Sequence, residues 1–448
     1  MKLLLTHGYF LMEDPKEQRI MKPYAPLGIL SISAHLRNKG FDVDIYDSTF
    51  GTREELFRIL DEGPPGALGI YGNLMTRRNV LDLVERGRAA GWKVILGGPE
   101  PPNYAEEFLA AGADLIVAGE AELSLERLLA SGLDRSRWAS IPGIIFSGDD
   151  GTVVRTGPAE LISNLDAQPW PDRERVDIPR YLKVWREHHG AGSVSLITAR
   201  GCPYHCNWCS HSVYGKSHRR RSPHSVVDEV EWILNRYQPE MIWFADDVFT
   251  IHHGWITEYA AEMNRRCLHI PFECITRADR FNARMAETLA QLGCFRIWIG
   301  SESGSQRILD AMQRGVKVEQ VREAVSLCKQ HGIQTGMFLM WGYEGEEISD
   351  IEATVDHVKT CRPDVFFTTV SYPIKGTPYF ERVASKLVTL RPWQDSTDRE
   401  LMIKGRHSRR FYQYADDLLK SETAAQPSPE TIRAAREALW QTAAEVEV

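Results

Sequence analysis

The sequence predicts an α/β protein with an N-terminal doubly wound domain, a partial (β/α)6 barrel and a helical C-terminal region. Three observations support this fold class. Short apolar runs alternate with helical patterns over residues 1–135, the alternation resumes at residue 193, and charged helical patterns follow residue 383. Strand–helix alternation with strands this apolar is typical of parallel sheets that are covered on both faces.

The first domain, residues 1–135, contains five apolar strand candidates. Strands are expected at 2–6, 41–47, 67–71, 93–98 and 114–120, with helices at 27–40, 53–61, 78–90 and 103–111. Rossmann-like sheets of this kind bind ligands outside the carboxyl ends of their strands. Four residues at such ends are candidate cofactor contacts: Gly97, Gly98, Gly119 and Glu120.

Residues 136–192 change in character, with a proline-rich and charged stretch at 168–181, and we expect a linker that contains a β-hairpin around Asp150-Gly151. Residues 193–383 carry six further strand candidates, at 193–199, 241–247, 272–277, 295–303, 335–342 and 364–373. Helical runs separate these strands, which predicts a barrel with its active site at the carboxyl ends of the strands. Residues 384–448 are expected to form helices, at 408–422 and 424–446.

Composition excludes some classes of protein. A net charge of -8 over 448 residues gives no reason to expect nucleic-acid binding. The apolar run Leu3–Leu5 is too short for a signal peptide, and no stretch approaches the ~20 apolar residues of a membrane span. We therefore expect a cytoplasmic protein without a membrane span.

Three of the eight cysteines, Cys202, Cys206 and Cys209, lie within eight residues with the spacing C-x3-C-x2-C. Zinc is one interpretation, with His205 or His211 as the fourth ligand. A redox pair at Cys206 and Cys209 is another, but it leaves Cys202 unexplained. A 4Fe–4S cluster with three thiolates would keep one iron open for a substrate or cofactor. The other five cysteines are expected to be buried structural thiols: Cys267, Cys274, Cys294, Cys328 and Cys361.

The cysteine spacing, with Trp208 before the last cysteine, resembles the motif of the radical S-adenosylmethionine (radical SAM) superfamily. The motif also follows the first strand of a six-strand pattern, as in that superfamily. The resemblance implies that the three cysteines are catalytic and hold a 4Fe–4S cluster whose open iron binds SAM. It further implies cleavage of SAM to a 5′-deoxyadenosyl radical, with electrons from a donor such as flavodoxin or ferredoxin.

Further residues at successive strand ends resemble the superfamily's SAM contacts. Asp246 and Asp247 match the groups that bind the amino end of SAM, and Arg277 matches a partner of its carboxylate. Glu302 matches the residue that accepts hydrogen bonds from the ribose, and Gly342 lies where backbone groups meet adenine. Each also has a structural interpretation, such as a solvated acid or a surface ion pair.

A doubly wound domain before such a barrel resembles the cobalamin-binding subgroup of radical SAM enzymes. That subgroup includes the anaerobic magnesium-protoporphyrin cyclase and many carbon and phosphorus methyltransferases. The matching segments are 26–47, 94–100 and 115–129. The resemblance implies cobalamin at Gly97, Gly98, Gly119 and Glu120. The mutase-type D-x-H-x-x-G pattern is absent near the first strand, and Glu100 stands where many relatives have histidine.

The resulting hypothesis is cobalamin-dependent methylation of an unactivated carbon in a small-molecule or lipid substrate. A first alternative is a radical cyclase, dehydratase or rearrangement enzyme without methyl transfer, with or without cobalamin. A second, from another class, is a non-catalytic zinc- or cluster-binding protein. The basic run at 218–221 is expected to be a solvated loop, and most aromatic residues of the barrel strands are expected to lie in the core.

Overall fold

The computed structural model describes residues 2–447. The chain falls into two compact units, which are described separately. Unit 1 comprises residues up to Pro203, Ser210–Ile242 and Trp393–Thr397, and unit 2 comprises Tyr204–Cys209, Trp243–Pro392 and residues from Asp398 onward. The boundary therefore passes through the C-x3-C-x2-C motif.

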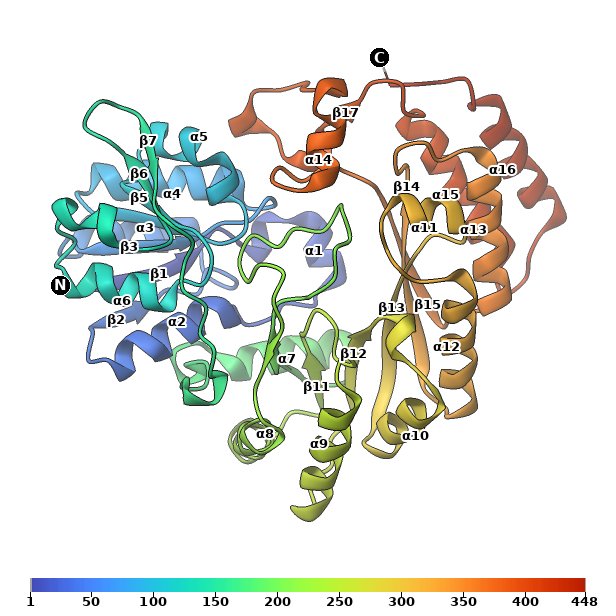
Figure 1. Cartoon of the computed structure of the whole chain (residues 1–448), viewed down its shortest axis with the longest axis horizontal. Helices are drawn as coiled ribbons and strands as arrows, with labels where there is room; N and C mark the ends of the chain where they lie inside the picture. The colour runs from blue at the N-terminus through green and yellow to red at the C-terminus, as the bar shows by residue number, and fades with distance from the viewer. Residues whose placement is uncertain (1, 448) are drawn as a thin grey trace. The chain divides into compact units, whose positions relative to one another are not determined.

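Unit 1 is built on a seven-stranded sheet with the order β2-β1-β3-β4-β5-β6-β7 (Figure 1). The strands are β1 (Leu3–His7), β2 (Val43–Ile45), β3 (Ala67–Tyr71), β4 (Lys93–Gly97), β5 (Leu115–Val117), β6 (Ile144–Ser147) and β7 (Val153–Arg155). The first five are parallel, and their order is that of flavodoxin-like doubly wound sheets. The predicted fold class of this domain is confirmed.

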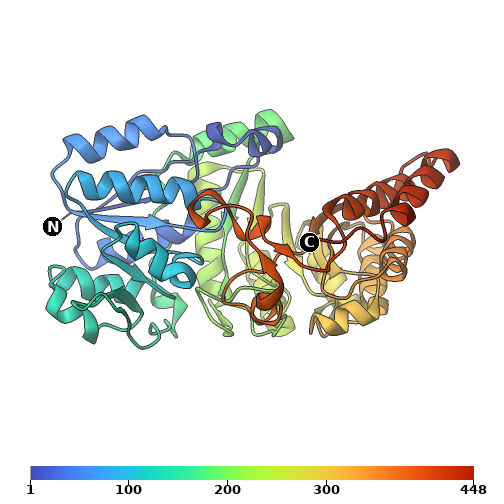
Figure 2. The ribbon, with the colours of Figure 1, turned by 90° about the horizontal axis from the view of Figure 1, so that it is seen from above.

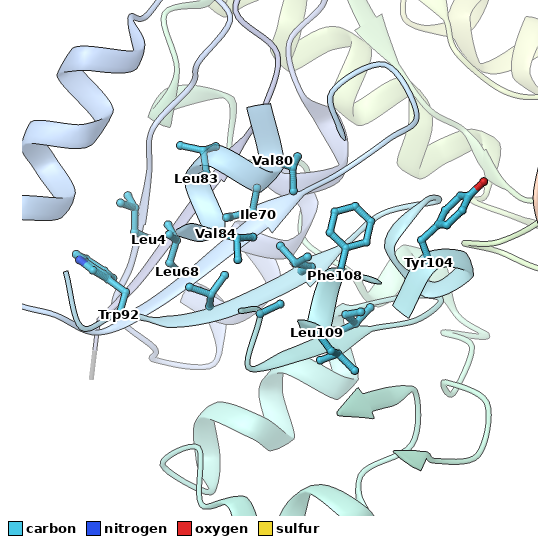
Figure 3. Packing of buried hydrophobic residues seen from close by; sticks show 14 of the residues in the cluster. Leu4, Leu68, Ile70, Val80, Leu83, Val84, Trp92, Tyr104, Phe108 and Leu109 are labelled. Carbon is cyan, nitrogen blue, oxygen red and sulfur yellow. The ribbon is translucent and has the colours of Figure 1, made fainter. Parts of the chain in front are cut away.

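Helices cover both faces of this sheet. Contacts place α2 (Leu27–Asn38) beside α6 (Glu122–Ala130), and α3 (Arg53–Glu62) beside α4 (Arg77–Ala89). Leu3 and Leu5 pack into the cluster that contains α2 and α6 residues, whereas Leu4 packs into the cluster of α3, α4 and α5 (Ala105–Ala110). Figure 3 shows the second cluster, with Leu4 and Leu68 beside Val84. Successive residues of a strand face opposite sides of the sheet, and helices cover both sides, so the strands are apolar along most of their length.

The predicted hairpin forms, and it belongs to the sheet. Strand β6 pairs antiparallel with β5, and β7 pairs antiparallel with β6. Helix α7 (Ile178–His189) follows, with Asp177 capping its first turn. The rest of unit 1 includes α1 (Pro15–Ile20), β8 (Ser193–Leu196), β9 (Ala199–Arg200), β10 (Arg219–Arg220) and α8 (Pro223–Tyr237). The segment between the two predicted domains is thus regular structure over much of its length.

Strand β11 (Met241–Phe244) begins in unit 1 and ends in unit 2. Within unit 2, four parallel strands follow the order β15-β14-β13-β12. They are β12 (Phe272–Thr276), β13 (Cys294–Glu302), β14 (Gln334–Trp341) and β15 (Val365–Val370), and their helices are α9 (His253–Arg265), α10 (Ala283–Gln291), α11 (Gln306–Ala311), α12 (Val318–Gln330) and α13 (Ile348–Cys361). Each of the six predicted barrel strands therefore has a counterpart.

The C-terminal region is helical, as predicted. It follows α14 (Pro378–Val383) and contains β16 (Leu387–Val388), β17 (Met402–Ile403), α15 (Arg409–Thr423) and α16 (Pro429–Gln441). Helices α15 and α16 lie side by side next to α13, at the red end of the chain in Figure 2. Within residues 2–447, no helix has the length and apolar character needed to span a bilayer.

Candidate functional site

The motif cysteines differ from most of the scattered ones in exposure. Cys202 and Cys206 are half-buried and Cys209 is exposed, whereas all scattered cysteines except Cys267 are buried. The prediction of buried structural thiols is therefore wrong for Cys267, which follows the end of α9 at the surface. Burial raises the pKa of Cys328 to about 12 and that of Cys361 to about 11, which keeps them as thiols.

The loop that carries the motif is fixed by Asn207, which sequence reasoning did not identify. Its side chain donates to the carbonyl of Ala311 at 2.9 Å and accepts from the hydroxyl of Tyr343 at 2.7 Å. Its backbone N–H donates to Met312 O at 3.2 Å. Trp208 packs beside it against the cluster that contains Ile308 and Met312, so its ring anchors the loop.

Cys202 belongs to unit 1, whereas Cys206 and Cys209 belong to unit 2. No group of three or more His, Cys, Asp or Glu side chains that could hold a metal ion occurs among residues 2–447. The assignment of the three cysteines to a cluster therefore remains a prediction from their spacing.

Two arginines surround the sulfur of Cys206. Nη1 of Arg277 and Nη1 of Arg314 each lie 3.7 Å from Cys206 Sγ. Arg277 follows β12, as predicted, but Arg314 follows α11 and is separated from Cys206 by 108 positions. Nothing in the local sequence marked Arg314 as a site residue.

Every nitrogen of the Arg277 guanidinium has a protein acceptor. Nε donates to Asp279 at 2.9 Å, Nη2 donates to the carbonyl of Arg314 at 2.8 Å, and Nη1 points at Cys206. The ring of Tyr204 stacks on the guanidinium at 3.7 Å. A bidentate contact between Arg277 and the SAM carboxylate, the predicted role, would have to replace some of these bonds.

Glu302 ends β13 in the left-handed backbone region, with φ of 62°. This conformation is unfavourable for residues other than glycine and is typically retained at functional positions. Burial raises the pKa of the Glu302 carboxyl, although Arg314 and Arg277 oppose this shift. Oε1 lies 3.7 Å from Nε of Arg314.

Three serines fasten the loop around Glu302 to α13. The pairs are Ser301 with His357 at 3.1 Å, Ser303 with Thr354 at 3.1 Å, and Ser305 with Asp350 at 2.6 Å. Their partners lie on successive turns of one face of α13, so the loop is held at every second residue. Burial and the nearby Arg322 lower the pKa of His357 to about 4, which keeps its imidazole neutral.

Gly342 follows β14 with φ of 73°, and a Cβ there would lie 2.9 Å from the ring of Tyr412. Its N–H donates to Glu346 Oε2 at 2.5 Å. Burial raises the pKa of Glu346 to about 8, so this carboxyl is mostly protonated at neutral pH. Asp246 and Asp247 follow β11, the first buried and the second exposed.

Unit 1 has a cavity of about 350 Å³ at the carboxyl ends of its parallel strands. The four predicted contacts, Gly97, Gly98, Gly119 and Glu120, all line it, and apolar side chains form most of the remaining wall. Gly98 has φ of 101°, and a Cβ there would lie 2.3 Å from the carbonyl oxygen of Gly72. The backbone therefore forms this part of the wall.

The carboxylate of Glu120 is already paired inside unit 1. It accepts from Arg200 and from Arg219, each at 2.6 Å, and Arg200 also contacts Glu122 at 2.8 Å. The expectation of a solvated basic loop is therefore wrong. Arg219 is partly buried by its pairing with Glu120, and Arg221 is likewise bound to Glu229.

The residues that line the cavity do not include Glu100, which stands where the family resemblance would place a histidine. It is buried and accepts from Nε of Arg77 at 2.7 Å. The Arg77 guanidinium lies between the rings of Tyr104 and Trp393, at 4.6 and 5.0 Å. Glu100 is thus part of a packed ion pair. Among the barrel aromatics, Phe244, Trp298 and Trp341 are buried, as expected.

Two family models match the chain: the radical SAM superfamily over residues 196–358 and the B12 binding domain over residues 20–129. The chain contains a radical SAM domain and a B12-binding domain. It is therefore a radical SAM enzyme, and its domains imply a 4Fe–4S cluster, SAM and cobalamin as cofactors.

Relatives of this radical SAM enzyme include an uncharacterized methyltransferase of Pyrococcus horikoshii, 26% identical over 85% of this chain and 83% of that protein. Another is the anaerobic magnesium-protoporphyrin IX monomethyl ester cyclase of Synechocystis sp., 28% identical over 75% of this chain and 67% of that protein. Among solved structures, the cobalamin-dependent SAM radical enzyme OxsB with aqua-cobalamin bound has a TM-score of 0.75, with 20% identity over 94% of this chain and 66% of that chain. This structural likeness establishes the fold.

One feature of the described residues suits each of the two implied groups. Arg314 is a buried cation whose hydrogen-bonded partners are a carbonyl oxygen and the Cys206 sulfur, which suits a thiolate. The cavity of unit 1 has apolar walls and a glycine-lined floor at the sheet edge where doubly wound folds bind ligands, which suits a large flat ring.

Proposed function

We propose that the protein is a cobalamin-dependent radical SAM methyltransferase that methylates an unactivated carbon of a small-molecule or lipid substrate. The observation that carries the proposal is the apolar cavity at the strand ends of the B12-binding domain, in a chain that also carries the C-x3-C-x2-C motif. Two relatives named as a methyltransferase and a cobalamin-dependent enzyme support it.

When bound, the cluster with SAM supplies a hydrogen-abstracting radical, and cobalamin supplies a methyl group. Net methylation consumes two SAM molecules and two electrons. The substrate hydrogen leaves in 5′-deoxyadenosine, the methyl group of the second SAM takes its place, and methionine and S-adenosylhomocysteine are released. A small donor such as flavodoxin or ferredoxin would provide the electrons.

The chain's residues have separate tasks in this proposal. Cys202, Cys206 and Cys209 supply three thiolates, and Asp246 with Asp247 receive the ammonium group of SAM. Glu302, presented by its left-handed backbone, accepts from ribose hydroxyls. The remaining residues act through their backbone groups. Gly342 would contact adenine, and Gly97, Gly98 and Gly119 would contact the corrin ring.

A second candidate is radical cyclisation, dehydration or rearrangement without methyl transfer. The similarity to the Synechocystis cyclase favours it, as does the buried Arg77–Glu100 pair, because Glu100 occupies a position noted for histidine in relatives. The products separate the two candidates, because only methyl transfer yields S-adenosylhomocysteine.

The test is anaerobic turnover with a reconstituted cluster, cobalamin, SAM and a strong reductant, with products measured by mass spectrometry. We expect 5′-deoxyadenosine and S-adenosylhomocysteine, with cobalamin retained on the protein. Deoxyadenosine alone, without retained cobalamin, would contradict methyl transfer and favour the second candidate. The Cys206→Ala variant should form neither product, and Cys267→Ala, which removes an exposed cysteine outside the motif, should match the wild type.

A further inference from the structure

The sulfur of Cys206 receives two cationic donors that are themselves almost inaccessible to solvent. The side chains of Arg277 and Arg314 are 3% and 8% exposed, and each places Nη1 at 3.7 Å from Sγ. This distance is within the range of an N–H···S hydrogen bond. Two buried guanidinium groups on one sulfur would repel each other unless negative charge lay between them.

The two arginines are held in place by each other and by the sheet. Arg277 donates to the backbone carbonyl of Arg314 at 2.8 Å. Nη2 of Arg314 donates to the carbonyl of Gly300, on β13, at 2.9 Å. A Cβ at Gly300 would lie 2.6 Å from that nitrogen, so the missing side chain makes room for the guanidinium. Neither arginine can leave the sulfur without losing these backbone bonds.

The two arginines differ in how closely a carboxylate approaches them. Asp279 hydrogen-bonds to Arg277 at 2.9 Å and compensates it. The nearest carboxylate oxygen to Arg314, on Glu302, is 3.7 Å from Nε, which has no hydrogen-bond partner among the described residues. The hydrogen-bonded partners of Arg314 are therefore the carbonyl of Gly300 and the sulfur of Cys206.

We propose that Arg277 and Arg314 set the reduction potential of the cluster held through Cys206, an inference that rests on the proposed function. Hydrogen bonds to cluster sulfurs and nearby positive charge stabilise the reduced cluster, so both arginines raise the potential. The step is a one-electron reduction in which the external donor is oxidised and no bond to the protein forms or breaks. Arg277 and Arg314 are positioning residues, because they act on the cluster through the cysteine ligand.

The experiment is a redox titration of the full-length protein with a reconstituted cluster, without SAM, followed by the EPR signal of the reduced cluster. We expect Arg314→Gln to shift the balance toward the oxidised cluster at least tenfold, which is 59 mV for one electron. Arg277→Gln should shift it in the same direction, and Arg314→Lys should shift it less. Arg296→Gln is the matched control, because Arg296 lies near the opposite end of β13 and bonds to Gln334.

Unchanged midpoint potentials in both glutamine variants, with iron content equal to the wild type, would overturn the inference. If a glutamine variant does not retain iron, Arg314→Lys is measured in its place. Lysine keeps the positive charge but cannot form the same guanidinium hydrogen bond, so a midpoint equal to the wild type would contradict the proposed effect of the hydrogen bond to Cys206. A shift in Arg277→Gln only after SAM is added would assign Arg277 to SAM instead. Absence of any cluster signal in the wild-type protein would refute the proposed function itself.

Discussion

Substitution of Gly98 by alanine tests whether backbone shape at the edge of the B12-binding domain controls the cavity. Gly98 has φ of 101°, and the new Cβ would lie 2.3 Å from Gly72 O and 3.0 Å from the ring of Tyr71. A left-handed backbone costs alanine about 1–2 kcal/mol, and overpacking adds about 1–3 kcal/mol. We therefore expect Gly98→Ala to lower the free energy of unfolding by about 2–5 kcal/mol.

Gly132→Ala separates the two contributions. Gly132 also has a positive φ, 67°, but a Cβ there has nothing within 4 Å, so only the backbone cost of about 1–2 kcal/mol remains. Urea unfolding followed by circular dichroism measures stability, and absorbance of cobalamin after gel filtration measures its retention. Gly98→Ala should lose cobalamin while Gly132→Ala keeps it. Equal unfolding free energies and equal retention in both variants would refute the reasoning.

Three further predictions concern buried polar groups. Glu229→Gln should destabilise the protein by about 3–5 kcal/mol in urea unfolding, because Arg173 and Arg221 would both lose a buried carboxylate. Glu240→Gln is the control: Glu240 forms an exposed pair with Arg186, so its loss should cost less than about 1 kcal/mol. Glu346 has its pKa raised from 4.5 to about 8, so its contribution to stability is complete below pH 4.5 and is lost as the pH rises toward 8. Glu346→Gln should therefore remove a slope of up to about 1.4 kcal/mol per pH unit across that window, and an unchanged pH profile would contradict a buried neutral carboxyl. His357→Ala removes the hydrogen bond between His357 and Ser301, which is worth about 1 kcal/mol. If that free energy is lost from SAM binding, the affinity measured by equilibrium dialysis should fall roughly fivefold. Arg296→Gln should leave the affinity unchanged.

The fold could be predicted from the sequence because each unit repeats the alternation of apolar strands and helices, which is visible in short stretches of sequence. The interiors of apolar strands such as 67–71 and 93–98 are buried on both faces, and the spacing of these strands along the sequence indicates a parallel sheet. The hairpin at residues 141–158 was also visible, but its attachment to β5 was not, because antiparallel pairing at a sheet edge depends on which strand lies there.

The candidate site could be predicted only in part, because some of its contacts join residues that are far apart in the sequence. Cys206 follows a predicted strand, and Arg277 and Glu302 lie at the ends of predicted strands, so the strand pattern was enough to identify them. Arg314 lies 108 positions from Cys206, and Arg219 lies 99 positions from Glu120. Long-range ion pairs of this kind leave no local pattern, and a basic run is by default read as solvated.

The distribution of charge distinguishes the two candidate sites. Around Glu120 in unit 1, two arginines face two carboxylates, so the ionic groups beside the cavity are balanced among themselves and the apolar wall remains neutral. Around Cys206 in unit 2, Arg314 has no hydrogen-bonded carboxylate among the described residues and depends on the sulfur. A buried charge is costly unless an anionic group lies close to it. The nearest carboxylate oxygen to Arg314 is 3.7 Å away, so this site suits a further anionic group, whereas the balanced ion pairs beside the cavity suit a neutral one. A cluster held in part by Cys206 would supply that anionic group, and a corrin ring would fit the apolar cavity in unit 1, so the charges are consistent with the division of cofactors that the family models imply.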